Sequence, residues 1–393
     1  MIDTGFLQEH ILSQRDETLL NEAREFGKQY FTEEAIRSWY QEGGIPDSVM
    51  QAYRDSNLGY LGLDDRFGGP DVSWTAQMAI LEELTRNAGA AIPMQSQMLC
   101  FNVVSRFANE HQGRFLVDLY KETARPGFSI AFADDETGSD FRSYKTAVYK
   151  KDGTYYIRGR KAFVNNGMFI PYVLVIAKNM VEYDDIETAP FSIWLVPMDS
   201  SGVTAYPINT LGQHIMPTAA IEFDDVQVDP EWQIGNALLI RQNMYALMNL
   251  VRCVVGAGSL GMAQAALEDS IAYAKHHEIR NRPLVKFQQI AEMITDMQID
   301  VSNMRSLLYE ATIAIDKKSP DTALSVAIMK KYVPAAAVRV ADCGIQIFGG
   351  VGYTDATRLS RIWVDCRANQ LASGTDQVMA IVGAKEIAAR YIS

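Results

Sequence analysis

Two glycine-containing segments near the C-terminal end combine residue types that suit a ligand site. The first is Gly349-Gly350-Val351-Gly352, directly after a helix-like segment, and the second is Ser373-Gly374-Thr375. Glycine has no Cβ, so the backbone at these places can come close to a ligand or to a neighbouring chain. A hydroxyl such as that of Ser373 is a poor proton acceptor at neutral pH without a base beside it. Glycine loops also occur as plain turns, and it is the combination of the two segments that favours a site.

The elements that position these segments follow from the spacing of apolar residues. Residues 1 to about 125 are predicted to be helical, because Ser48–Tyr60 and Trp74–Asn87 both place apolar residues three and four positions apart. Between them, residues 64–70 form a loop by their glycine and proline content.

From about Phe128 the pattern becomes that of β-strands. Ala147–Lys151, the turn Asp152-Gly153 and Tyr155–Arg158 together predict a β-hairpin. Further strands, rich in Val, Ile and aromatic residues, are predicted at Pro171–Lys178, Phe191–Met198 and Ile221–Val226. The β region therefore covers about residues 126–232.

Helices return after Gly235. Asn243–Lys275 is one long amphipathic stretch, in which Gly256, Gly258 and Gly261 permit close contact with another helix. The next helix, Phe287–Lys317, carries a methionine-rich stripe that we interpret as core packing, because methionine fills helical cores. The stripe consists of Ile290, Met293, Ile294, Met297, Val301, Met304 and Leu308. Two more helices are predicted at Ala323–Gly344 and Gln377–Tyr391.

Composition narrows the class of protein. With 393 residues, 48% hydrophobic and 21% charged, the chain suits two or three packed globular domains. The net charge of −12 argues against a nucleic-acid surface, which needs concentrated Lys and Arg. The four cysteines form no CxxC pattern, so we expect buried small residues rather than a metal site or disulfides. We find no bilayer-spanning run and no leader at Met1, and therefore expect a cytoplasmic protein without a membrane partner.

The two glycine segments, read together as Q-I-F-G-G-V-G-Y from Gln346 and L-A-S-G-T-D-Q to Gln377, resemble the C-terminal signature of the acyl-CoA dehydrogenase family. The pattern L-G-x-x-x-x-F-G-G that ends at Gly69 resembles another loop of that family. The likeness covers the whole chain. It implies an α+β fold with an N-terminal helical domain (1–125), a central β-barrel (126–232) and a C-terminal four-helix bundle (233–393) that builds a tetramer, and it implies FAD as cofactor.

The segment Phe132–Asp140 is similar to the family's first flavin loop, with Gly138, Ser139 and Asp140 matching. The resemblance implies that the backbone of Phe132 and Ala133 meets the polar edge of the flavin, and that Ser139 contacts the acyl-CoA chain. Ala133 stands where the family has threonine. Without the resemblance, the segment would be an acidic surface turn.

Gly159–Asn166 resembles the family's G-x-K-x-W-I-T-N strand, in which an aromatic residue lies beside the flavin and a hydroxyl bonds near N5. Phe163 keeps the aromatic face, and Asn165 keeps the capacity for hydrogen bonding.

The resemblance places the reacting centre at Arg252 and Ser373, with Asn249 and Gly374 on the substrate side. The family usually has a catalytic glutamate at the position of Ser373, and some members have it at the position of Val251. Neither position holds a carboxylate here. A positioned general base accelerates such a proton abstraction by about 10²- to 10⁴-fold, so the usual chemistry lacks its base.

In the family, the adenylate part of FAD is bound across a subunit interface. Gln346, Gly349 and Gly350 match the adenylate motif, while Thr375 and Gln377 match flavin-side residues. His277 occupies the position of an arginine that pairs with the FAD pyrophosphate, and Arg280 lies at the phenylalanine position of the same motif. A histidine is only partly charged near pH 7, so we expect weaker pyrophosphate binding unless Arg280 takes over.

Three functions stay open. The first is an FAD-dependent acyl-CoA dehydrogenase or reductase that acts on the α,β-bond of a thioester of CoA or of an acyl carrier protein, as in fatty acid metabolism, with an electron-transferring flavoprotein as partner. Within the family the closest likeness is to the crotonobetainyl-CoA reductase branch. The second is a catalytically impaired subunit of a heteromeric tetramer, rather than a homotetramer. The third is a flavin-dependent monooxygenase on the same scaffold, which needs no base for the α-carbon.

Overall fold

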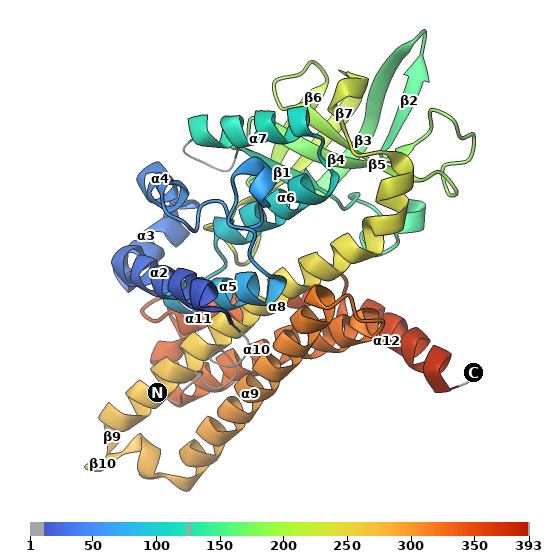
Figure 1. Cartoon of the computed structure of the whole chain (residues 1–393). Helices are drawn as coiled ribbons and strands as arrows, with labels where there is room; N and C mark the ends of the chain where they lie inside the picture. Colours follow the sequence, from blue (N-terminus) through green and yellow to red (C-terminus); the bar gives the residue numbers. More distant parts are fainter. Residues whose placement is uncertain (1–11, 124–126, 392–393) are drawn as a thin grey trace.

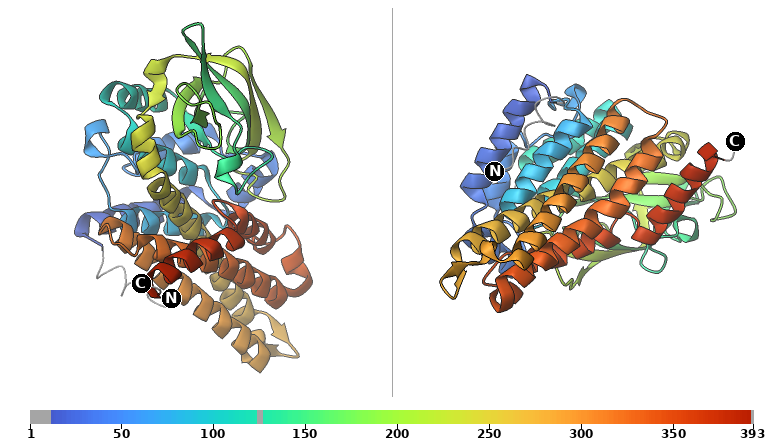
Figure 2. Two further views of the ribbon diagram at one scale, coloured as in Figure 1. Left: turned by 90° about the vertical axis from the view of Figure 1, so that its right-hand side faces the viewer. Right: turned by 90° about the horizontal axis from the view of Figure 1, so that it is seen from below.

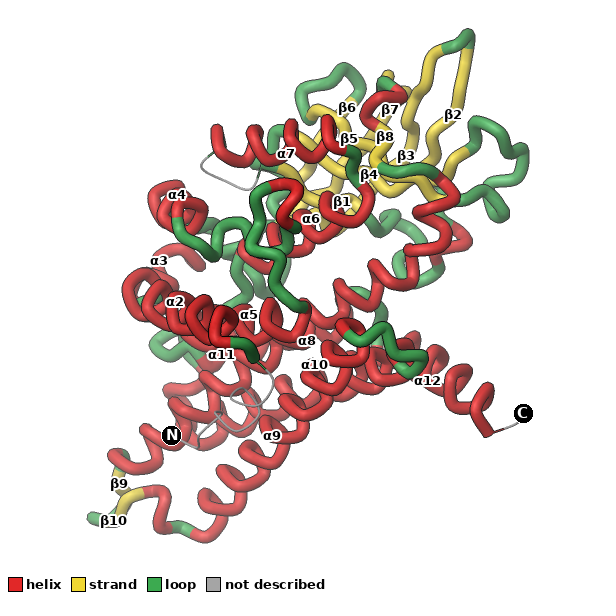
Figure 3. The backbone as a smooth tube through the Cα atoms, viewed as in Figure 1, coloured by secondary structure: helices red, strands yellow, loops and turns green. Residues whose placement is uncertain are grey.

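The computed structural model describes residues 12–123 and 127–391, and it has a helical part, a sheet and a second helical part along the chain (Figure 1). The predicted α+β class is confirmed. Strands gather at one end of the molecule, while the short β9–β10 pair lies at the opposite end (Figure 3). The first helical part consists of α2 (Gln14–Tyr30), α3 (Glu33–Glu42), α4 (Asp47–Asp55), α5 (Trp74–Ala88), α6 (Pro93–Phe107) and α7 (Glu110–Glu122).

Side-chain caps start several of these helices. Ser13, Thr32 and Ser73 each accept a hydrogen bond from a backbone N–H in the first turn of the helix that follows, which satisfies an otherwise unpaired donor. Helix α4 ends at Asp55, so the predicted extension to Tyr60 is wrong. The Ser56 hydroxyl donates to the Tyr53 carbonyl at 2.6 Å and turns the chain out of the helix.

The eight strands of the main sheet follow the order β6-β7-β3-β2-β4-β5-β8, and β1 pairs with β4 in parallel. The predicted hairpin is confirmed: β2 and β3 pair antiparallel around Asp152 (φ 53°) and Gly153 (φ 84°). Pairing of β3 with β7 is interrupted by irregularities between Ile157 and Gly159 and between Lys161 and Val164. The strands are β1 (Phe128–Ala131), β2 (Ala147–Lys151), β3 (Thr154–Asn165), β4 (Tyr172–Asn179), β5 (Phe191–Pro197), β6 (Val203–Ile208), β7 (Thr218–Val228) and β8 (Gln233–Ile234).

Helix α8 (Ala237–His276) runs from the sheet to the far end of the molecule (Figure 1). Its glycines make the close contacts that the sequence predicted. A Cβ on Gly261 would lie 2.2 Å from the Glu82 carbonyl oxygen on α5, and one on Gly256 would lie 2.6 Å from the Met329 sulfur. The other C-terminal elements are β9 (Glu278–Ile279), β10 (Arg282–Pro283), α9 (Gln288–Asp316), α10 (Thr322–Phe348), η5 (Gly349–Tyr353), α11 (Leu359–Leu371) and α12 (Asp376–Tyr391).

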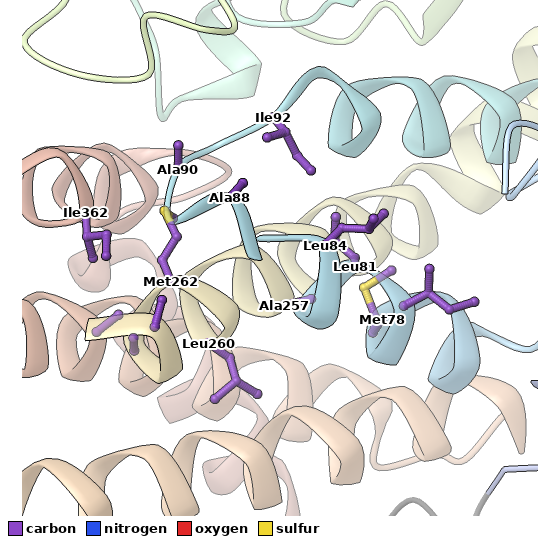
Figure 4. Close-up of a cluster of buried hydrophobic side chains, with 14 of the residues drawn as sticks. Met78, Leu81, Leu84, Ala88, Ala90, Ile92, Ala257, Leu260, Met262 and Ile362 are labelled. Atoms are coloured by element: carbon purple, nitrogen blue, oxygen red, sulfur yellow. The ribbon is translucent and has the colours of Figure 1, made fainter. Parts of the chain in front are cut away.

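Packing of α8 joins the hydrophobic cores. Leu247 and Met248 of α8 belong to the cluster shared with α6, α7 and one face of the sheet, whereas Leu260 belongs to the larger helical cluster. In that larger cluster Met262 of α8 lies towards Ala90 and Ile362, whereas Leu260 points to the opposite side of α8 (Figure 4). Seen from below, α8, α9 and α10 lie alongside one another (Figure 2). The methionine-rich stripe of α9 packs into this cluster as predicted: Met297, Val301, Met304 and Leu308 are buried, and Ile290, Met293 and Ile294 are half-buried against it.

A buried carboxylate ties the three parts together. Asp365 on α11 is 0% exposed and accepts hydrogen bonds from the Tyr40 hydroxyl (2.7 Å), the Ala91 N–H (2.9 Å) and the Gln213 N–H (2.5 Å). Tyr40 and Ala91 belong to the first helical part, and Gln213 belongs to the loop between β6 and β7. Two parts of the chain therefore supply donors to an acceptor that belongs to the third.

One expectation about membranes is corrected. Met244–His276 is long and apolar enough to cross a bilayer by length and composition, contrary to the prediction that no such run exists. Because 78% of its most apolar window is buried inside the protein, the segment has the character of a core helix. The four cysteines are free, and Cys100, Cys253 and Cys366 are buried, in line with their interpretation as small core residues.

Candidate functional site

Helix α8 and the loop between α11 and α12 bring together Arg252, Asn249, Ser373 and Gly374. Arg252 is 5% exposed, and its Nε donates to the Ser373 carbonyl at 3.3 Å. Its Nη1 donates to Asn249 Oδ1 at 3.1 Å. Burial lowers the pKa of the Arg252 guanidinium from its ordinary value. The four residues that were predicted for the reacting centre and the substrate side therefore form one cluster.

The backbone at Ser373 is unusual for a residue with a side chain. Ser373 has φ 59° and Gly374 has φ 104°, so two successive residues lie in the left-handed half of conformational space. Such a conformation costs free energy at Ser373 and persists only where surrounding contacts hold it. Two side-chain donors supply these contacts, Arg252 to the Ser373 carbonyl and Lys330 to the Gly374 carbonyl at 3.1 Å.

Lys330 was not predicted from the sequence. It lies on α10, is 0% exposed, and has its pKa lowered to about 8 by burial, with Asp376 acting in the opposite direction and Arg252 in the same direction. The only sequence signal was a lysine within an apolar stretch of a core helix.

Thr375 and Gln377 start α12: the Thr375 hydroxyl accepts the Val378 N–H at 3.4 Å, and Gln377 is exposed.

The predicted flavin loop is fixed to strand β3 by a buried ion pair that the sequence did not reveal. Lys161 Nζ lies 2.7 Å from Asp134 Oδ1 and also donates to the Phe132 carbonyl at 2.8 Å. Burial lowers the pKa of Lys161 to about 8. Burial opposes ionisation of Asp134 as well, yet Lys161 and the N–H of Thr146 hold the pKa of Asp134 below its ordinary value.

The other residues of the predicted flavin loop differ in their contacts and exposure. The Ala133 carbonyl accepts the Ala162 N–H at 2.9 Å, so the carbonyls of Phe132 and Ala133 are both engaged. Gly138 (φ 26°) has open space where a Cβ would stand, and Ser139 is exposed. Contact of their backbone N–H groups with the polar edge of a bound ring stays a prediction.

Phe163 has the strongest geometric mark of a ligand contact on β3. It stands at the irregularity of the β3–β7 pairing with φ 56°, and its side chain is 65% exposed. Exposing an aromatic ring on a strained backbone costs free energy, and stacking of a planar ligand ring on it would offset that cost. Asn165 is half-buried, and the neighbouring Asn166, which was not predicted, has a buried Nδ2 without a hydrogen-bond partner among the described residues.

The predicted adenylate residues gather at the other end of α8. His277 stacks on Tyr273 with ring centroids 4.7 Å apart, and Tyr273 stacks on Phe348 at 4.0 Å. This stack brings His277 next to the segment that holds Gln346, Gly349 and Gly350, all of them exposed. A Cβ on Gly349 or Gly350 would meet no atom within 4 Å, and Arg280 is exposed with φ 52° in the β9–β10 turn.

The two predicted halves of the cofactor site lie far apart on one chain. At 1.5 Å per residue, Arg252 and His276 at the end of α8 are about 36 Å apart, which exceeds the reach of an extended flavin dinucleotide. The ring-side residues fit a flavin through Phe163 and the polar atoms around it. The adenylate-side residues fit an anion through their open backbone, with His277 and Arg280 as the sources of positive charge. These two halves would then serve different cofactor molecules.

Comparisons with known proteins bear on the whole chain. Family models match it as acyl-CoA dehydrogenase N-terminal domain over residues 13–122, middle domain over residues 129–226 and C-terminal domain over residues 240–388. The probable acyl-CoA dehydrogenase YdiO of Escherichia coli is 30% identical over 380 residues, which are 97% of this chain and 98% of that protein.

Two solved structures have the same fold. The acyl-CoA dehydrogenase of Slackia heliotrinireducens is 35% identical, with a TM-score of 0.86 over 97% of this chain and 98% of that one. Butyryl-CoA dehydrogenase of Megasphaera elsdenii is 26% identical, with a TM-score of 0.85 over 96% and 98%.

Proposed function

The chain belongs to the acyl-CoA dehydrogenase family, and we propose that it is an FAD-dependent oxidoreductase acting on the α,β-bond of an acyl thioester. The observation that carries the proposal is the cluster of Arg252, Asn249 and the Ser373-Gly374 loop, together with the exposed Phe163 on β3. When bound, FAD supplies the hydride acceptor for such a reaction. The chain's own residues position the two reactants.

In this proposal each part has a separate task. Phe163 supports one face of the flavin, and the N–H groups of Phe132 and Ala133 meet its polar edge. The ion pair of Lys161 and Asp134 keeps that loop against β3. Ser139 and Gly374 border the path of the thioester, as the family resemblance implies.

Among the described residues at the two positions where the family has its glutamate, no side chain can accept the proton that leaves the α-carbon. Val251 is half-buried against apolar side chains, and Ser373 offers only a hydroxyl. Cys253 is buried, and burial raises the pKa of its thiol to about 12, so it is not a thiolate at neutral pH. Two conditions would allow the reaction without a base from this chain. The substrate could have an α-proton that needs no strong base, or another chain could supply the carboxylate.

A second candidate is a subunit that completes a partner's site. The absence of a carboxylate at positions 251 and 373 favours this candidate, as does His277 in place of an arginine. A subunit can contribute adenylate-side residues to the FAD site of its partner without catalysing the reaction itself. The distance along α8 supports an assembly in either case, and we propose a tetramer, homomeric or heteromeric. An electron-transferring flavoprotein would collect the electrons of an active form. A flavin-dependent monooxygenase is retained only because it would need no base.

Purification of the protein alone tests these functions. An active dehydrogenase is expected to retain FAD and to lose its yellow colour when an acyl-CoA is added under anaerobic conditions. Colourless protein that gains flavin only with a second chain would favour the helper subunit instead. Consumption of oxygen by the reduced protein, with incorporation into a product, would point to the monooxygenase.

A further inference from the structure

Two buried cations meet at the Ser373-Gly374 loop without an ion pair. Arg252 is 5% exposed and Lys330 is 0% exposed. Their acceptors are the carbonyls of Ser373 and Gly374 and the amide oxygen of Asn249, all of which are neutral. Within residues 12–123 and 127–391, neither cation forms an ion pair with a carboxylate whose side chain is described. Two positive charges thus lie at the loop without an ion-pair partner among the described residues.

Other buried cations of this chain are matched differently. Three form short ion pairs: Lys161 with Asp134 at 2.7 Å, Arg305 with Glu82 at 2.6 Å and Arg361 with Glu33 at 2.7 Å. The ammonium of Lys178 donates to two backbone carbonyls at 3.3 Å and lies in the field of Asp185 and Glu187. The pattern elsewhere is therefore that each buried cation has acidic residues near it.

Asp376 supplies part of the missing negative charge. Its carboxylate acts electrostatically on Lys330, and its Oδ2 accepts the Gln370 amide at 2.5 Å. Its Oδ1 is buried and has no hydrogen-bond partner in the described part of the chain. The half-buried Asp376 thus acts on Lys330, and no described carboxylate forms an ion pair with Arg252. A buried cation without a counter-charge is costly, and a bound anion would remove that cost.

We propose that this site takes an acyl thioester whose acyl group itself carries a carboxylate, and that Arg252 binds that carboxylate. The inference rests on the proposed function, because it assumes that a thioester is bound beside the Ser373-Gly374 loop. Related enzymes carry a glutamate at the position of Ser373. Serine is smaller than glutamate and carries no negative charge that would repel a carboxylate of the substrate.

The chemistry of the three side chains suits such a group. A guanidinium forms two parallel hydrogen bonds with a carboxylate, and these charge-assisted bonds are about twice as strong as neutral ones. Lys330 adds positive potential from behind the loop, and the Ser373 hydroxyl can donate to a carboxylate oxygen. The site would discriminate against the same acyl chain when it ends in a neutral group.

Binding of unreactive CoA thioethers tests the inference on the full-length protein loaded with FAD. A matched series ends in a carboxylate, in the corresponding neutral amide or in a methyl group, with two to four carbons between sulfur and end group. Calorimetry measures affinity, and the flavin absorbance reports contact with the ring. The carboxylate compound should bind at least ~10-fold more tightly than its amide. Equal affinities, or tighter binding of the amide, would overturn the inference.

Two variants assign the preference to Arg252. Arg252→Met should reduce the carboxylate-to-amide ratio to about 1, whereas Arg339→Met, on a surface arginine paired with Asp300, should leave it unchanged. Should Arg252→Met fail to fold, Ser373→Glu provides the counter-charge from the protein and should abolish the preference while the methyl compound still binds. A preference that persists in Ser373→Glu and in folded Arg252→Met would exclude Arg252 as the receptor.

The outcomes separate this inference from the function on which it rests. If all three compounds bind and perturb the flavin equally, the carboxylate inference fails and the thioester site stands. If none binds to FAD-loaded protein, both fail.

Discussion

Lys161 Nζ lies 2.7 Å from Asp134 Oδ1, and this buried contact joins the loop predicted to border the flavin to the strand that carries Phe163. Lys161→Met leaves the Asp134 carboxylate buried without its cation. We expect a loss of about 3–5 kcal/mol in the free energy of unfolding, measured by urea denaturation. Replacing both partners with apolar residues should restore much of that loss.

The neighbouring pair of Arg160 and Asp135 is the control for this prediction. It has similar geometry at 3.0 Å, but the side chains are 49% and 43% exposed. Arg160→Met should cost about 1 kcal/mol or less, because solvent screens the pair. Similar losses in both variants would mean that burial does not decide the value of the Lys161 pair.

Phe163→Gly should separate stability from cofactor binding. Glycine tolerates φ 56°, and the exposed ring contributes little to the core, so the free energy of unfolding should change by no more than about 1 kcal/mol. Loss of the aromatic surface should weaken FAD binding by up to ~10-fold, measured by flavin fluorescence on the apoprotein. Tyr183→Ala, another exposed aromatic residue, serves as control and should leave FAD affinity unchanged.

His277→Arg should tighten FAD binding in the assembled protein. Arginine is charged at all accessible pH values and pairs with phosphate through two donors. The gain should be about tenfold at low ionic strength and should shrink as salt is added. The matched variant is His276→Arg, one position earlier and also exposed. An unchanged affinity in His277→Arg, or an equal gain in both, would remove His277 from the pyrophosphate site.

The buried ammonium of Lys330 should make stability depend on pH. Burial lowers the pKa of Lys330 to about 8 in the folded chain, against an ordinary value of 10.5, while Asp376 raises it and Arg252 lowers it further. Between about pH 8 and 10.5 the unfolded chain binds more protons, so this group makes stability rise with pH. Relative to Lys330→Met, the wild type should gain about 2–3 kcal/mol across that window.

The exposed neighbour Lys331 is the control for this measurement. Lys331→Met should follow the wild-type dependence on pH, because both sequences keep Lys330. A Lys330→Met variant with the wild-type slope would show that this ammonium is not responsible. Chemical denaturation at several pH values gives the slopes, and the differences between variants cancel the titration of cysteines and tyrosines.

Sequence patterns predicted the structure correctly where a few neighbouring residues determine the backbone conformation. Asp152-Gly153 specified a hairpin because both residues accept positive φ, and the α8 glycines indicated close helix contacts that the structure contains. Helix α11 was not predicted. Its buried face includes Arg361 and Asp365, whose polar character conceals the helical period, since their partners come from residues hundreds of positions away.

The candidate site was predictable only in part. Family likeness located Arg252 and Ser373, and the structure brings them within hydrogen-bond distance. Neither Lys330 nor the pair of Asp134 and Lys161 could be recognised, because a lysine in an apolar helix or an aspartate in a loop gives no sign of burial. Burial depends on tertiary packing, and the electrostatics of the site depend on burial.

Asp365 on α11, which accepts donors from the first helical part and from the loop between β6 and β7, limits how this molecule can open. Swinging the sheet away from the helices would strand a fully enclosed carboxylate without its Gln213 partner. The three parts should therefore tumble as a single rigid body, and a substrate should be admitted by local displacement of loop side chains, with no bending at a hinge between domains.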